Sequence, residues 1–193
     1  MIDIKRILDE ISVLPELKQQ VSSKQIMLQT VEGCTDPYFG TGYIYQFSKG
    51  GVHVQGDYKD LQNVKKLFED SNWQEINDLD DSVCEFIDVK ETDFTIPMFP
   101  ELEYTNSVIE ELGLYRARLI NLQPARCVTR HVDQTPRLHI PLITHEQCKI
   151  VYDDEIVHFP ADGKVYRIDG QRPHMAYNAS LIDRYHIIGC IHE

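Results

Sequence analysis

Residues 115–143 read YRARLINLQPARCVTRHVDQTPRLHIPLI and contain three short runs of β-forming residues separated by turn residues. The pattern continues to residue 191, with turn signals such as Asp153-Asp154 and Asp169-Gly170 between the runs. Many short, closely spaced strands are typical of an antiparallel sandwich or barrel. The runs therefore predict a mainly β fold, a double-stranded β-helix (jelly roll) of the cupin kind. The predicted strands are Tyr115–Leu122, Cys127–His131, Arg137–Thr144, Lys149–Tyr152, Glu155–Phe159, Lys164–Ile168, His174–Asn178 and Arg184–Ile191.

The first 113 residues show helical periodicity instead. Apolar residues recur at helical spacing over Ile4–Leu14, which a proline follows, and again over Leu61–Trp73. A short helix is predicted over Val108–Leu112, with the next glycine as its C-terminal stop. We expect these helices to buttress one face of the jelly roll. The whole chain would then be one domain, with a helical elaboration in residues 1–113 and a jelly-roll core that carries the site in residues 114–193.

Composition excludes several classes of protein. The chain has 193 residues, 42% of them hydrophobic, and a formal net charge of −12. The apolar content is typical of a folded globular protein, and the negative charge disfavours nucleic acid as a partner. Residues 1–9 lack the long apolar core that a signal peptide has, and nowhere do about 18 apolar residues run together as a membrane span requires. We therefore predict a cytoplasmic protein with no membrane partner; its five widely spaced cysteines fit reduced thiols.

A metal site is predicted from three residues. His131 and Asp133 form an H-x-D triplet, and in an extended segment both outer side chains point to the same face. His174, at the start of a later strand, is placed to converge on them. Because two histidines and one carboxylate leave half the coordination sphere open, this set suits a non-haem Fe(II) site. The triplet alone is weak, since one such triplet is expected by chance.

A buried arginine is predicted on the last strand. Arg184 follows His174 by ten residues, and alternation sends Arg184 and His186 to the same face. An inward arginine is costly unless an anion neutralises it. A bound dicarboxylate would satisfy this requirement through a two-pronged contact.

Arg137 and His139 also share one face of a predicted strand, while the apolar residues between and after them share the other. From periodicity alone, two interpretations are equally good. Either the cationic face lines a pocket, or it is solvated while the apolar face forms the core.

In the order and spacing of its motifs, the sequence from Tyr115 to Ile191 resembles the aspartyl/asparaginyl β-hydroxylase-like family of 2-oxoglutarate oxygenases. That family includes hydroxylases of free amino acids such as proline. The motifs are Arg116-Ala117-Arg118-Leu119, His131-Val132-Asp133, Arg137-Leu138-His139-Ile140-Pro141-Leu142 and His174-Met175-Ala176-Tyr177-Asn178, with Arg184 ten residues past the histidine.

The resemblance implies a role for each motif. His131, Asp133 and His174 look like the iron ligands, and Arg184 looks like the partner of the terminal carboxylate of 2-oxoglutarate. Arg137 and His139 look like pocket residues near the metal-proximal carboxylate of the co-substrate, which favours the pocket-facing interpretation of their strand. Arg118 resembles a basic position on the substrate side.

The function implied is that of a dioxygenase that uses Fe(II), 2-oxoglutarate and O₂ to hydroxylate an amino acid or an amino-acid residue, with release of succinate and CO₂. We expect a small amino-acid-like substrate rather than a protein. Two alternatives stay open: a cupin-type metal-dependent isomerase or dioxygenase that does not use 2-oxoglutarate, and a jelly-roll binding module without catalysis. Arg184 discriminates against the first alternative and the intact ligand set against the second.

Overall fold

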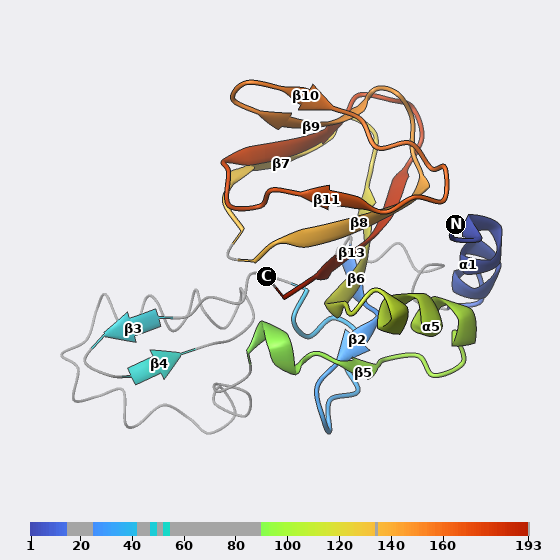
Figure 1. Ribbon diagram of the computed structural model, residues 1–193, viewed down its shortest axis with the longest axis vertical. Helices are drawn as coiled ribbons and strands as arrows, with labels where there is room; N and C mark the ends of the chain where they lie inside the picture. The colour runs from blue at the N-terminus through green and yellow to red at the C-terminus, as the bar shows by residue number, and fades with distance from the viewer. Residues whose placement is uncertain (15–24, 42–46, 50–51, 55–89, 134, 193) are drawn as a thin grey trace.

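Two antiparallel sheets form the body of the protein (Figure 1). The structure, a computed structural model, describes residues 1–14, 25–41, 47–49, 52–54, 90–133 and 135–192. In these residues one sheet has the strand order β1-β6-β13-β8-β11 and the other the order β10-β9-β12-β7. Strands that are distant in sequence lie side by side in both sheets, as in a jelly roll. The predicted double-stranded β-helix is confirmed.

Each of the eight predicted runs corresponds to one strand of the two sheets, with bounds that differ by up to two residues at either end. The first sheet consists of β1 (Gln25–Met27), β6 (Tyr115–Leu122), β13 (Arg184–Cys190), β8 (Arg137–Ile143) and β11 (Tyr166–Ile168), and the second of β10 (Ile156–Val157), β9 (Cys148–Tyr152), β12 (His174–Asn178) and β7 (Arg126–His131). Two small pairs complete the described strands: β2 (Gln29–Thr30) with β5 (Ile96–Pro97), and β3 (Phe47–Lys49) with β4 (Val52–Val54).

Helices cover the outer face of the first sheet. The helices α1 (Ile4–Ile11) and α5 (Glu103–Glu111) contact each other, and their buried side chains join those of β6, β8 and β13 in one hydrophobic cluster. Figure 1 shows both helices on the side of this sheet that faces away from β9 and β10. The apolar face of β8 thus packs against helices while its other face turns toward the second sheet. Among the described helices, none is long and apolar enough to cross a membrane.

The two described helices differ in length from the prediction. The first ends at Ile11, because Val13 and Leu14 donate to carbonyls only three residues back in a tighter final turn. The second begins at Glu103, five residues before the predicted start. The Glu10 carboxylate accepts hydrogen bonds from the backbone N–H groups of Tyr104 and Thr105 at 2.9 and 2.8 Å. This cap comes from the other helix, so local sequence does not reveal it.

The expectation that residues 1–113 are helical is wrong in part. Besides the helices, this half contains β1, which pairs with β6 and belongs to the main sheet, and a one-turn 3₁₀ helix, η2 (Glu91–Asp93). Two- and three-residue strands carry too little alternation to be recognised. The predicted helix over Leu61–Trp73 lies outside the described residues.

A β-bulge distorts β6 where it passes the cavity between the sheets. Ile188 and Cys190 of β13 are two residues apart. Their partners on β6, Arg118 and Tyr115, are three residues apart, so β6 has one extra residue here. The extra residue is accommodated at Arg116, whose φ of 52° is left-handed. Gln29 supports the distorted backbone: its side-chain amide donates to the Leu114 carbonyl and accepts from Ala117 N–H, each at 2.9 Å.

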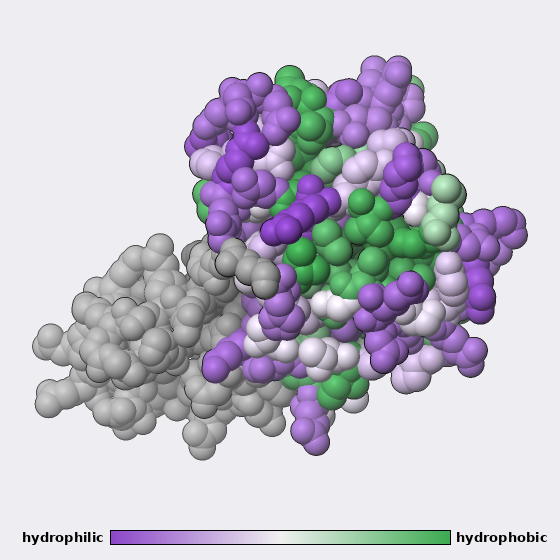
Figure 2. Space-filling view, viewed as in Figure 1, coloured by the Kyte–Doolittle hydropathy of each residue, from purple (hydrophilic) through white to green (hydrophobic). Residues whose placement is uncertain are grey.

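Figure 2 shows the surface of the face that is drawn in Figure 1. On this face apolar residues gather over β8 and β11 and toward α1.

Candidate metal centre and its cavity

Three potential metal ligands meet at the end of β7 and the start of β12. His131 and His174 are directly paired across these antiparallel strands, and their ring centroids are 4.4 Å apart. Asp133 follows two residues after His131, with Val132 exposed between them. The Asp133 carboxylate oxygens lie 3.7 Å from His131 Nε2 and 3.6 Å from His174 Nε2. One donor atom from each residue falls within 4.8 Å of the others, a spacing that one ion can bridge.

Backbone carbonyls fix the tautomers of both histidines. His131 Nδ1 lies 2.7 Å from the Thr129 carbonyl, and His174 Nδ1 lies 2.9 Å from the Arg172 carbonyl. Because a carbonyl oxygen can only accept, each Nδ1 carries the hydrogen and each Nε2 keeps its lone pair. The two lone pairs are therefore on the nitrogens that face Asp133. The donor set fits a divalent transition metal.

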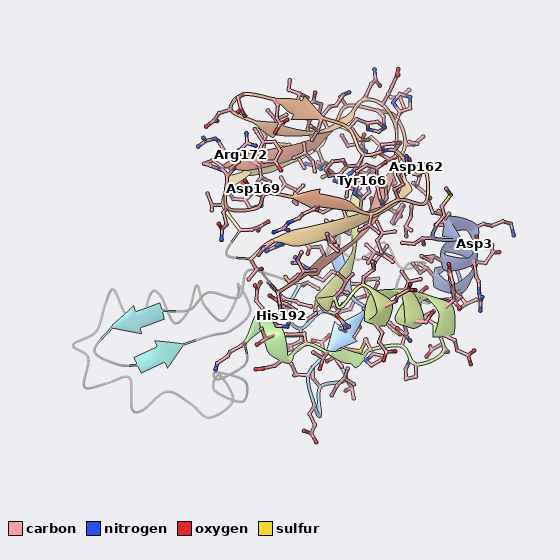
Figure 3. The ribbon with its side chains drawn as sticks, in the orientation of Figure 1. Asp3, Asp162, Tyr166, Asp169, Arg172 and His192 are labelled. Carbon is pink, nitrogen blue, oxygen red and sulfur yellow. The ribbon has the colours of Figure 1, made fainter. Side chains whose placement is uncertain are left out.

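The turn between β11 and β12 positions two of the three ligands. Figure 3 labels Asp169 and Arg172 in this turn. The Gly170 carbonyl accepts the Asp133 N–H at 2.7 Å, while the Arg172 carbonyl orients His174. A Cβ on Gly170 would lie 2.8 Å from the Asp133 Cβ, so only glycine permits this close approach. The guanidinium of Arg172 anchors the turn by stacking over the Tyr152 ring at 4.5 Å.

A cavity of about 370 Å³ opens between the two sheets beside the three ligands. Its size is appropriate for one or two small molecules. All seven residues predicted as site residues line it: His131, Asp133, His174, Arg184, Arg137, His139 and Arg118. Apolar side chains, among them Ile120, Ile150 and Ile188, make up much of the remaining wall.

Arg184 lies buried in the cavity wall. Its guanidinium contacts the ring nitrogens of His186 at 3.1 and 2.9 Å. Burial lowers the pKa of Arg184 to about 10, so the group remains charged at neutral pH. Within the described part of the chain, no carboxylate lies within ion-pair distance of it. A buried cation without a counter-ion is costly, and an anion bound beside it would offset that cost.

Arg118 is a second buried cation in the same wall. Its Nη1 donates weakly to the Gln25 side chain at 3.3 Å and to the Thr41 carbonyl at 3.4 Å. Its Nε and Nη2 are buried without a hydrogen-bond partner among the described residues. Burial, followed by the charges of Arg116 and Arg137, lowers the pKa of Arg118 to about 9. Two unsatisfied donors on a charged group fit an anionic ligand.

Arg137 pairs with the carboxylate of the metal centre. Its Nη2 lies 2.7 Å from Asp133 Oδ1 and 3.9 Å from Glu91 Oε1. The pocket-facing interpretation of Arg137 and His139 is confirmed, because both line the cavity and His139 is buried. The apolar residues on the opposite face of β8 are buried too, in the core beneath the helices. A role of Arg137 in contacting the co-substrate stays a prediction.

Glu91 was not predicted from the sequence. It belongs to the 3₁₀ helix η2, and its carboxylate contacts two arginines that line the cavity. Its carboxylate forms an ion pair with Arg116, accepts a hydrogen bond from Thr135 at 2.9 Å, and faces Arg137. Burial raises the pKa of Glu91, but the charges of Arg116 and Arg137 outweigh this effect, so its pKa is lower than the ordinary 4.5. Nothing in the local sequence marks Glu91, because its partners lie 25 or more residues away.

We expect Glu91→Gln to destabilise the fold by about 3 kcal/mol, because it removes the carboxylate charge that pairs with the buried Arg116 guanidinium. Thermal or urea unfolding at neutral pH measures this loss, with the exposed Glu101→Gln as the control. Since the folded-state pKa of Glu91 is depressed, its contribution is complete above about pH 4.5 and is lost as the pH falls below that value. Equal stability of wild type and variant at neutral pH would show that the ion pair adds nothing.

Several solved structures are similar to this chain at low sequence identity. A cupin-2 domain protein from Shewanella frigidimarina is 16% identical, with 38% of this chain and 66% of that chain aligned and a TM-score of 0.31. A conserved protein of unknown function from Streptococcus pyogenes is 17% identical, with coverages of 40% and 64% and a TM-score of 0.33. A predicted oxalate decarboxylase from Thermotoga maritima is 16% identical, with coverages of 44% and 72% and a TM-score of 0.35. The chain thus spans just under two thirds of the first two structures.

Comparison of the sequence with protein families identifies the relatives of this chain more specifically than these solved structures do. No curated protein matches the chain significantly. The sequence pattern of the family described as aspartyl/asparaginyl beta-hydroxylase matches residues 61–192, which include every residue of the cavity from Arg116 onward. This match covers more than half of the chain. The protein therefore belongs to the aspartyl/asparaginyl beta-hydroxylase family.

Proposed function

We propose that the protein is an Fe(II)- and 2-oxoglutarate-dependent dioxygenase that hydroxylates a small amino-acid-like substrate. The observation that carries the proposal is the combination, in one cavity, of the three convergent ligands with the buried, uncompensated Arg184. Family membership supports the same chemistry, since the family implies dependence on iron and 2-oxoglutarate in general.

His131, Asp133 and His174 would hold the iron. Two nitrogen lone pairs and one carboxylate match the ligand set that non-haem Fe(II) oxygenases use, and they leave positions open for a co-substrate and O₂. Iron held there would supply the O₂ activation that is needed to hydroxylate an unactivated C–H bond, coupled to conversion of 2-oxoglutarate to succinate and CO₂. The protein itself orients both organic molecules and, through the apolar wall, keeps water away from the reacting atoms.

Arg184 would bind the terminal carboxylate of 2-oxoglutarate. A guanidinium can hold a carboxylate with two parallel hydrogen bonds, and burial makes this contact stronger than it is in water. A cupin-type enzyme that does not use a dicarboxylate has no need for a buried arginine at this position. The residue therefore favours the oxygenase over that alternative.

Arg118 would bind the carboxylate of the substrate. Its two unsatisfied donors need an anion, and a single 2-oxoglutarate held by Arg184 and the metal has no third carboxylate to offer. A free amino acid carries an α-carboxylate, whereas a residue inside a polypeptide does not. The site thus favours a free amino acid or a small derivative of one.

A turnover assay tests the substrate class. With Fe(II), 2-oxoglutarate and O₂ present, succinate release is measured with free amino acids and with the same amino acids N-acetylated and C-amidated. We expect stimulation by one or more free amino acids and little by the blocked forms. Arg118→Gln should raise the KM for the responding amino acid by about 10-fold or more, because a charge-assisted hydrogen bond is lost.

The exposed Arg167→Gln is the control for that variant. Preference for blocked forms, or succinate release coupled only to a protein, would contradict the assignment of a free amino acid. Wild-type KM values in Arg118→Gln would contradict the role of this arginine.

A further inference from the structure

The connection from β7 to β8 crosses from the second sheet to the first and carries the ligand Asp133. Its backbone is held at both ends. The Asp133 N–H donates to the Gly170 carbonyl at 2.7 Å, and the Pro136 carbonyl accepts the N–H of the residue after β13 at 3.1 Å. Between these points the Thr135 hydroxyl donates to Glu91 Oε2 at 2.9 Å. A side chain from η2, 44 residues earlier, thus holds the middle of this connection.

The Asp133 carboxylate itself is held by few direct contacts. It is buried, and its Oδ1 has no hydrogen-bond partner among the described residues. Arg137 Nη2 lies 2.7 Å from this oxygen in an ion-pair contact, but the guanidinium N–H groups are not directed at it. The direction of the carboxylate therefore depends on the backbone that carries it and on where Arg137 lies.

Glu91 is a rigid anchor for this backbone. The residue that ends η2, Phe94, is fully buried, and its carbonyl accepts the Arg116 N–H of β6 at 2.8 Å. The Arg116 guanidinium forms an ion pair with Glu91 Oε1 and also donates from Nε and Nη2 to the Gly40 carbonyl at 3.2 and 2.8 Å. Because Oε1 is engaged in this way, Oε2 has a fixed direction toward Thr135.

We propose that Glu91 is a positioning residue of the metal centre, and that its hydrogen bond to Thr135 sets the position of the Asp133 carboxylate relative to the two histidine ligands. Glu91 also faces Arg137 at 3.9 Å, so it acts on both groups that determine where this carboxylate lies. The inference rests on the proposed metal centre but not on 2-oxoglutarate. It gives η2 a part in a site whose ligands all follow residue 130.

Variants of Thr135 test this role without removing the charge of Glu91. Co(II) alone is titrated into the protein by calorimetry, and the visible absorption of bound Co(II) reports the arrangement of its ligands. Thr135→Val keeps the shape of the side chain but has no hydroxyl. We expect it to bind Co(II) about 10-fold more weakly than wild type and to have an altered spectrum at saturation, because groups that orient a ligand contribute about that much or more to metal affinity.

Two further variants serve as controls. Thr135→Ser keeps the hydroxyl and should bind Co(II) within about 3-fold of wild type, since the retained hydrogen bond still orients the ligand. Thr144→Val removes a hydroxyl that has no hydrogen-bond partner in the described part of the chain, at the other end of β8, and should bind as wild type does. Equal losses of affinity in Thr135→Ser and Thr135→Val would overturn the proposal.

A double-mutant cycle assigns the effect to Glu91. Glu91→Met has a side chain of similar length but no acceptor for the Thr135 hydroxyl. If the two residues act through their shared hydrogen bond, Thr135→Val should weaken Co(II) binding in the wild-type background and not in Glu91→Met. The same loss in both backgrounds would contradict a role of Glu91. If Glu91→Met does not fold, the Thr135 variants decide.

The outcomes separate this inference from the proposed function. Wild-type Co(II) affinity and spectrum in Thr135→Val would overturn the positioning role and leave the oxygenase assignment standing. The expected loss in Thr135→Val, combined with no turnover dependent on 2-oxoglutarate in wild type, would support the positioning role and refute the oxygenase. Wild-type protein that binds no Co(II) would refute the metal centre and this inference together.

Discussion

Removal of either histidine ligand is expected to abolish Fe(II) binding and turnover. His174→Ala, or His131→Ala, takes one of three protein donors from the proposed centre. Loss of a group that only orients a ligand costs about 10–100-fold in metal affinity, so loss of the ligand itself should cost at least about 100-fold. Fe(II) binding is measured anaerobically by calorimetry, and turnover by succinate release.

The matched control is His145→Ala, which replaces an exposed histidine that does not line the cavity. It should bind Fe(II) as wild type does. Far-UV circular dichroism should be alike for all variants, because the two sheets do not depend on the metal for their hydrogen bonds. Full turnover in His131→Ala or His174→Ala would refute the metal assignment. Asp133→Ala is less decisive, since both imidazole ligands remain in that variant.

Replacement of Arg184 is expected to raise the 2-oxoglutarate requirement far more than the iron requirement. Arg184→Ala removes the buried cation proposed to bind the terminal carboxylate, which should cost about 2–5 kcal/mol of binding free energy. That corresponds to an increase in KM of roughly 30-fold to several thousand-fold. Arg184→Lys should recover only part of the loss, because an ammonium group cannot form the two-pronged contact.

Arg130→Ala serves as the control for this series, because Arg130 is an exposed arginine whose partner, Asp153, is exposed as well. Its KM for 2-oxoglutarate should equal that of wild type. The iron affinity of Arg184→Ala, measured without 2-oxoglutarate, should stay within a few-fold of wild type. An unchanged dependence on 2-oxoglutarate in Arg184→Ala would favour a metal-dependent cupin enzyme that does not use this co-substrate.

The strands of the jelly roll could be predicted because the signals that define each strand lie within a short stretch of sequence. Alternation with period two and clear turn residues define β6 and β12, whose observed bounds, Tyr115–Leu122 and His174–Asn178, equal the predicted ones. The helix α5 was predicted too short, because the group that caps its start is the Glu10 carboxylate, contributed by a residue more than 90 positions earlier. Strands as short as β1 gain their stability from pairing with β6, not from their own sequence.

The candidate site, like the fold, could be predicted where it depends on local sequence pattern, but not where it depends on contacts between residues that are distant in sequence. All seven predicted residues line one cavity, because the periodicity that defines each strand also defines which side chains point inward. What sequence could not supply was the set of contacts between them. The ion pair of Arg137 with Asp133 depends on how the chain folds after β7, and the contact of Glu91 with Arg116 depends on where η2 docks. That the whole chain forms one domain stays a prediction.

The central claim is that one cavity holds Fe(II) and 2-oxoglutarate together, and an anaerobic titration tests it most directly. The purified protein is titrated with Fe(II) and then with 2-oxoglutarate while the visible absorption spectrum is recorded. We predict a charge-transfer band that appears only when both are present and saturates at one equivalent of iron, and that is absent in His174→Ala. No band with wild-type protein at saturating Fe(II) and 2-oxoglutarate would contradict the account.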